Sequence, residues 1–138
     1  MREIVKTLLI IIALLYAFVG VTSLFSFLSF LIYVPKQEYA EDPLTLIWLI
    51  MPLLNSVVCF LIFYAFLRLK TWGRRLAITY NGLWLTYGIF ASIGGLITDP
   101  REFRLTDLPI LFLIGVFALL GGSILFYLWR EVRELMAA

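Results

Sequence analysis

The residues that could carry acid–base or metal chemistry are few in this chain of 138 residues. It contains nine Asp and Glu, eleven Lys and Arg, no His and a single cysteine, Cys59. Without His, the chain lacks the commonest metal ligand and the commonest general base. One cysteine can form neither an intrachain disulfide nor a thiolate metal cluster, and we interpret Cys59 as a packing residue. We therefore predict no catalytic residue, no metal site and no cofactor.

Six acidic residues lie in two short segments, where they could meet and bind a cation. They are Glu38, Glu41, Asp42, Asp99, Glu102 and Asp107. We interpret them as a solvated acidic rim, because groups of like charges usually stay hydrated. Cation binding is the alternative. These six are also the only candidate groups for a membrane-embedded enzyme, since the sequence has no phosphate-binding loop, nucleophile elbow or zinc motif. We predict that the protein is not an enzyme.

The overall composition is that of an integral membrane protein. Hydrophobic residues make up 63% of the chain, charged residues only 14%, and the mean hydropathy is +1.02. Ordinary soluble domains contain about 25% charged residues. The composition therefore excludes a soluble globular domain, a disordered chain and a nucleic-acid binder.

Four long stretches contain no charged residue, and they predict four membrane-spanning helices. The stretches are residues 7–35, 43–67, 76–98 and 108–129. About 20 apolar residues suffice for a helix to cross a bilayer core of about 30 Å. A β-barrel would need alternating hydrophobicity, which runs such as residues 8–15 lack. We predict an all-α single membrane domain over residues 1–138, with transmembrane helices at about 4–33, 43–67, 74–97 and 108–129. The last helix could continue as a charged cytoplasmic turn.

The net charge of the segments at the helix ends differs in sign between the two predicted sides of the membrane. The N-terminus, residues 68–75 and the tail hold eight basic and three acidic residues, a net charge of +5. The other two loops hold three basic and six acidic residues, a net charge of −3. Basic residues concentrate on the cytoplasmic side of membrane proteins, so both termini are predicted to be cytoplasmic. Short links make consecutive helices antiparallel neighbours, which predicts an up-down four-helix bundle.

The uncharged stretches leave no Asp, Glu, Lys or Arg at membrane depth, because the charged residues of the predicted helices lie only at their ends. Ion-coupled carriers and proton relays usually place such a group at membrane depth, so this pattern argues against both. Pro52 lies inside the second span and removes the hydrogen bond to the carbonyl of Trp48. We predict a kink there.

Small and polar residues recur at helical spacing on three predicted helices. Thr22, Ser26, Ser29 and Tyr33 share one face of the first, and Asn81, Gly88, Ser92 and Gly95 share a face of the third. Gly115, Ala118 and Gly122 share a face of the fourth. Small residues let membrane helices approach closely. We interpret these faces as internal packing of the bundle, and contact with a partner or a second copy is the alternative.

The third predicted helix also carries an aromatic face. Tyr80, Trp84 and Tyr87 recur at helical spacing along it. Such a face could hold an isoprenoid or a lipid tail. We interpret it as bulk that packs against a neighbour or against acyl chains.

The link between the second and third helices combines basic and aromatic residues. Lys70, Arg74 and Arg75 flank Trp72 at the predicted inner surface. Arg and Lys can reach anionic headgroups while an indole ring lies at the interface. We interpret the link as a topology anchor that contacts anionic lipid, with a dedicated lipid or protein docking site as the alternative.

This link and the tail carry a family resemblance. Residues 70–77 read Lys-Thr-Trp-Gly-Arg-Arg-Leu-Ala, which resembles the Lys-x-Trp-x-Arg-x-Leu-Ala link of uncharacterised small prokaryotic four-helix membrane proteins. Residues 127–135 are similar to the Arg-Pro-Glu-Val-Lys-Glu ending of those proteins, although this chain lacks the Pro. The resemblance implies a four-helix architecture in a prokaryotic plasma membrane and no known activity.

The sequence lacks recognisable catalytic and metal-binding residues and has several faces of small residues. Together these features favour a structural function. We predict a small non-enzymatic accessory or scaffolding subunit of a membrane assembly, whose partner is another membrane protein or a second copy. The alternative is a homo-oligomeric pore or transporter for a small solute or lipid, lined by Ser, Thr, Asn and Tyr.

Overall fold

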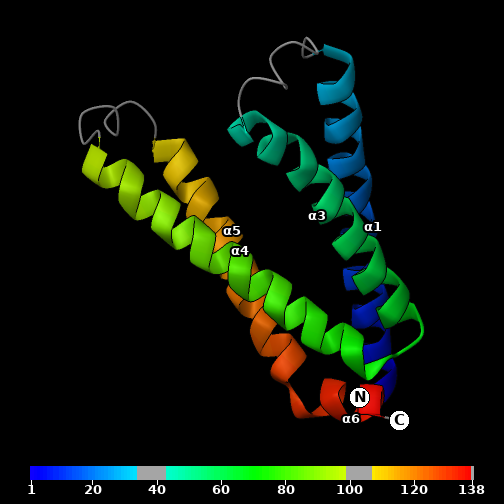
Figure 1. The fold of residues 1–138 in the computed structure, drawn as a ribbon. Helices are drawn as coiled ribbons and strands as arrows, with labels where there is room; N and C mark the ends of the chain where they lie inside the picture. Colours follow the sequence, from blue (N-terminus) through cyan, green and yellow to red (C-terminus); the bar gives the residue numbers. More distant parts are fainter. Residues whose placement is uncertain (34–42, 99–106, 138) are drawn as a thin grey trace. The chain divides into compact units, whose positions relative to one another are not determined.

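The computed structural model describes residues 1–33, 43–98 and 107–137, and this part of the chain is helical with no strand. Its helices are α1 (Arg2–Tyr33), α3 (Pro43–Leu67), α4 (Thr71–Thr98), α5 (Asp107–Leu128) and α6 (Arg130–Ala137), shown in Figure 1. The predicted acidic rim lies outside the described residues except for Asp107, which begins α5.

The helices begin and end near the predicted bounds, for reasons that the sequence makes plain. Pro43 begins α3, where a residue without an N–H group costs no helical hydrogen bond. The same helix ends at Leu67, directly before the charged Arg68. Asp107 begins α5, and Pro109 lies in its first turn. The charged tail forms a separate helix, α6, rather than a single turn.

Helices in the described part of the chain are suited to a membrane. Arg2–Tyr33 and Leu49–Leu67 are long and apolar enough to cross a bilayer. A third span results if Gly115–Leu128 and Arg130–Ala137, which are bent by 57° at their junction, count as one. These findings confirm the all-helical fold of the described residues and agree with a membrane protein. The order of four spans and the cytoplasmic termini stay predictions.

The chain divides into two compact units, of which the first is Met1–Gly73. Within it α1 and α3 lie side by side (Figure 1). Successive contacts along the pair join Tyr16 to Phe66, Gly20 to Cys59 and Ser23 to Asn55. Along these contacts the residue numbers rise in α1 and fall in α3, so the two helices are antiparallel. The buried residues of this unit include Ala13, Ser56, Cys59, Ile62 and Ala65.

The second unit, Arg74–Ala138, contains most of α4 together with α5 and α6. Gly88 of α4 packs against the ring of Phe117 in α5. Arg74, one residue into the unit, bonds to Tyr127 near the end of α5. These two contacts show that α4 and α5 are also antiparallel. The prediction of one membrane domain over both units stays a prediction.

Large apolar side chains cover much of the helix surfaces. Phe18, Leu83, Leu119 and Leu125 are each about two-thirds exposed or more. In water such a surface would be costly, but lipid tails solvate apolar side chains well. The exposed apolar surface therefore agrees with the membrane location inferred from composition.

Candidate functional site

The turn that joins α3 to α4 is closed by backbone hydrogen bonds. The N–H of Lys70 donates to the carbonyl of Ala65 at 2.8 Å, and that of Leu69 donates to Phe66 at 3.1 Å. This pair of bonds is the Schellman pattern that ends many helices. Leu69 has a φ of 49°, which places it in the left-handed region that Gly usually occupies at this position. The turn is therefore well defined, although one residue in it is strained.

The first turn of α4 lies directly against the last turns of α3. A Cβ added at Gly73 would overlap the methyl group of Ala65. Two small residues thus allow the backbones to touch, and this close approach requires the glycine. The N–H of Gly73 also donates to the carbonyl of Lys70 at 3.0 Å. Residues 68–75, which we call the basic turn, are consequently presented on a short, fixed support.

Three of the four basic side chains in the basic turn are accessible at the surface. Arg68, Lys70 and Arg75 are exposed, and Trp72 between them is 42% exposed. The basic turn contains no acidic residue. Within the described part of the chain, none of the three cations forms an ion pair or a side-chain hydrogen bond. The positive charge here is therefore not neutralised by the described residues.

Arg74, the fourth cation of the basic turn, has a different environment. Its Nη1 donates to the backbone carbonyl of Tyr127 at 3.3 Å. Tyr127 lies in the last turn of α5 and is fully buried. Carbonyls in the last turn of a helix lack helical partners and form the negative end of its dipole. Arg74 thus caps α5. The sequence predicted instead that Arg74 contacts lipid or a partner together with Lys70 and Arg75.

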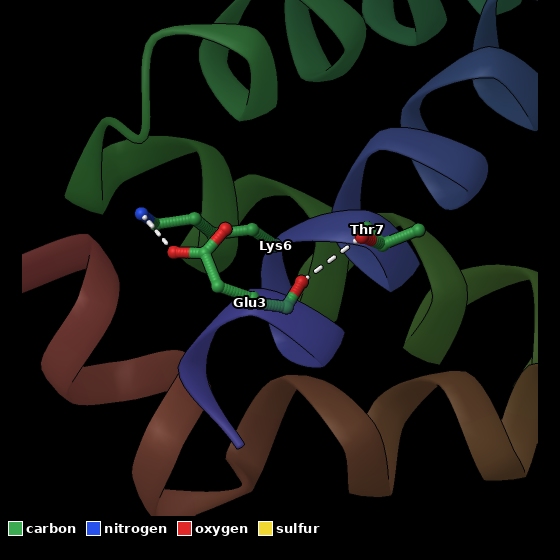
Figure 2. Close-up of polar contacts among 3 residues, drawn as sticks. All are labelled: Glu3, Lys6 and Thr7. Carbon is green, nitrogen blue, oxygen red and sulfur yellow. Dashed lines mark hydrogen bonds and ion pairs between the residues drawn. The ribbon is translucent and has the colours of Figure 1, made fainter.

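Two basic residues near the chain ends, Lys6 and Arg130, have acidic partners. Lys6 Nζ lies 2.9 Å from Glu3 Oε1, and Thr7 Oγ1 donates a hydrogen bond to the carbonyl of Glu3 (Figure 2). Both charges precede the uncharged stretch that begins at Thr7. The hydrogen bond from Lys6 and its positive charge lower the pKa of Glu3. In the tail, Arg130 Nε lies 2.7 Å from Glu134 Oε1. Among the described residues, no cation of the basic turn has a carboxylate partner of this kind.

The predicted hydroxyl face of α1 is exposed. Thr22 donates to the carbonyl of Val19 at 2.9 Å, and Ser26 donates to that of Thr22 at 3.0 Å. Ser29 is exposed as well. The outer residues of this face, with neighbouring aromatics, line a shallow groove formed by Phe25, Ser26, Ser29, Phe30 and Tyr33. The buried side of α1 consists of other residues: Val5, Leu9, Ala13, Tyr16 and Gly20.

Of the four residues in the predicted small and polar face of α4, the structure describes the surroundings of two. Asn81 is buried, with 3% of its surface exposed. The ring of Phe117 occupies the space that a side chain at Gly88 would need. Ser92 and Gly95 lie where the structure describes the helix but not the side chains. The three aromatic residues share a face of α4, as predicted. The ring of Trp84 packs edge-on against the rings of Tyr80 and Tyr87, with ring centroids 6.4 Å and 5.8 Å apart.

The predicted small-residue face of α5 is open. Gly115, Ala118 and Gly122 are all exposed. No described atom lies within 4 Å of a Cβ added at Gly115 or at Gly122. Gly20 differs, because a Cβ there would meet Cys59 and Phe60 at 3.3 Å. The glycines therefore separate into those packed inside a helix pair and those facing open space.

Sequence reasoning missed the contact that joins α1 and α3 inside the apolar region. Asn55 Nδ2 donates to Ser23 Oγ at 2.6 Å. The signal was present, because Asn55 is the one carboxamide in the span 43–67. Spacing alone could not assign its partner on a different helix. Pro52 lies inside α3 as expected, and the kink stays a prediction.

The described residues do not bring metal-ligating side chains together. They contain no group of three or more His, Cys, Asp or Glu side chains that could hold a metal ion. Cys59 is fully buried against α1. Apart from packing, the chemistry available here is ionic contact through the basic turn and hydrogen bonding through the hydroxyl face. Comparison with protein-family models, curated proteins and solved structures finds no match to this chain.

Proposed function

We propose that the protein is a small non-enzymatic integral membrane protein that serves as an accessory or scaffolding subunit of a membrane assembly. The observation that carries this proposal is the open face of Gly115, Ala118 and Gly122 on α5. Small residues at this spacing let a second helix approach closely, and lipid gives little reason to keep them exposed. The partner is another membrane protein or a second copy of this chain.

The membrane arrangement that we propose has four transmembrane helices in an up-down bundle with both termini in the cytoplasm. Its support is the charge distribution, +5 on one set of links and −3 on the other. The two antiparallel helix pairs agree with it. The resemblance of residues 70–77 to small prokaryotic membrane proteins supports location in a prokaryotic plasma membrane.

The decisive experiment compares leucine substitutions at neighbouring glycines. Gly122→Leu fills the open face with a bulky side chain, whereas Gly121→Leu places the same side chain one residue away. No described atom lies within 4 Å of a Cβ added at either position, so both variants should keep the thermal stability of the monomer or gain from the better helix propensity of Leu. We expect crosslinking in native membranes to recover a reproducible partner or dimer with wild type and with Gly121→Leu.

With Gly122→Leu that complex should be lost. Recovery of monomer alone from the wild-type protein would contradict the proposal. So would a complex that survives Gly122→Leu undiminished.

A second candidate is the homo-oligomeric pore or transporter for a small solute or lipid. The observation in its favour is the groove at the end of α1, whose lining mixes Ser26, Ser29 and Tyr33 with aromatic rings. Flux assays in liposomes separate the two functions. A selective flux that falls when Thr22, Ser26 or Asn81 is replaced by Ala supports transport, and absence of flux with retained partner capture supports the scaffold.

A further inference from the structure

We infer that the basic turn binds the phosphate of an anionic phospholipid headgroup through Arg68, Lys70 and Arg75, with Arg74 excluded from the site. The inference requires only that α3 crosses the bilayer. It is independent of whether the protein is a scaffold or a pore.

The position of the turn argues for a lipid partner. Residues 43–67 contain no charge, and α3 ends at Leu67 with Arg68 directly after it. The first cation therefore lies where the apolar part of the span ends. Lipid phosphates lie at this boundary, next to the hydrocarbon core.

The charges of the turn also favour a phosphate. Lys6 and Arg130 have carboxylate partners, whereas Arg68, Lys70 and Arg75 have none among the described residues. A guanidinium offers several donors to phosphate oxygens, and an ammonium offers a compact charge. The half-exposed indole of Trp72 is amphipathic and suits the interface between headgroups and acyl chains.

The backbone of the turn that carries these cations is held against the end of α3. The bonds from Leu69 and Lys70 to α3, and the contact of Gly73 with Ala65, limit the freedom of the backbone. A fixed backbone lowers the ordering cost when a ligand binds. Arg74 points instead to the carbonyl of Tyr127, so its charge serves α5 rather than the lipid.

The test titrates the purified full-length protein in mild detergent with phosphatidylglycerol or with phosphatidylcholine and counts bound lipid by native mass spectrometry. Each cation near an anionic surface contributes about fivefold in affinity. The triple variant R68Q/K70Q/R75Q should therefore bind phosphatidylglycerol about a hundredfold more weakly, with binding of phosphatidylcholine unchanged.

Two controls separate a site from general charge. The variant R2Q/R130Q/R133Q removes three positive charges that lie outside the proposed site, one of them already paired with Glu134, so the affinity for phosphatidylglycerol should fall by less than the contribution of one cation in the site, about fivefold. Arg74→Gln should lower the thermal stability but leave this affinity within about fivefold. Circular dichroism on each variant verifies that the helices are intact.

Several results would overturn the inference. Equal binding of phosphatidylcholine and phosphatidylglycerol by the wild type would remove the anionic preference. Equal losses in the two triple variants would indicate general electrostatics without a site. Retained lipid affinity in R68Q/K70Q/R75Q, together with loss of a crosslinked acidic protein, would show that the turn docks a protein instead.

Discussion

The hydrogen bond between Asn55 and Ser23 should couple α1 to α3 by a measurable free energy. The two side chains meet at 2.6 Å between otherwise apolar helix faces, and both are partly buried. Ser23→Ala deletes the acceptor and leaves one N–H of the Asn55 amide without this partner. Asn55→Ala deletes the donor together with any other contact of the amide. The double variant removes both groups.

A double-mutant cycle isolates the energy of the pair. Interhelical hydrogen bonds in membrane proteins average about 0.6 kcal/mol and reach about 1.7 kcal/mol. The short distance and the partial burial place this bond in the middle of that range. We expect a coupling free energy of about 1 kcal/mol, which is roughly a fivefold change in the unfolding equilibrium constant.

The measurement is reversible unfolding in mixed micelles with increasing dodecyl sulfate, followed by circular dichroism. A matched cycle pairs Thr22→Ala with Asn55→Ala. Thr22 is adjacent to Ser23, but its hydroxyl bonds to the carbonyl of Val19 on its own helix. Unconnected sites usually add within about 0.5 kcal/mol. A coupling for Ser23 and Asn55 no larger than that of the control cycle would refute the reasoning.

Three further predictions concern local features. Leu69→Gly should stabilise the protein by about 0.5 kcal/mol in the same unfolding assay, because relief of the left-handed strain, about 1–2 kcal/mol, exceeds the entropic cost of Gly, about 0.5–1 kcal/mol. An unchanged or lower stability would contradict the assigned strain. Gly73→Ala should destabilise the protein by about 1–3 kcal/mol through overlap with Ala65, and the added change Ala65→Gly should restore part of the loss, whereas an equal loss without rescue would place the cause elsewhere. Lys6→Met should raise the pKa of Glu3 toward its ordinary value, measured by carboxyl NMR in micelles. Because the folded pKa of Glu3 is lowered, the stabilisation from this pair is present at neutral pH and is lost as the pH falls through the lowered pKa. A pKa of Glu3 that does not respond to Lys6→Met would exclude the pairing in solution.

Helix ends were predictable because charges and prolines mark them. Transfer of a charge into lipid is costly, so an uncharged stretch such as 43–67 gives the limits of a helix directly. Pro43 and Asp107 add the stereochemistry of a helix start. The charge of Arg130 also marked the end of the last span near Trp129, but the bend of 57° between α5 and α6 was not predictable in this way, since neither Pro nor Gly lies at that position.

The contacts that individual side chains make with other helices could not be predicted from the sequence. The same helical spacing assigned Gly88 and Gly122 to small-residue faces, yet of the two only Gly88 meets a described side chain, because Phe117 lies opposite it on α5. Arg74 and Arg75 are adjacent and chemically identical, but helical rotation turns only Arg74 toward the end of α5. Periodicity assigns residues to a face of one helix, and the register between helices decides what that face meets.

The contact between Gly73 and Ala65 also sets a constraint on sequence length. The two residues are eight positions apart and come together across the basic turn. An inserted or deleted residue between them would rotate α4 and place a larger side chain, Trp72 or Arg74, against the end of α3. Related sequences should accordingly align without gaps across these positions and vary in length at other links. An epitope tag or a fusion protein belongs at one of those links rather than here.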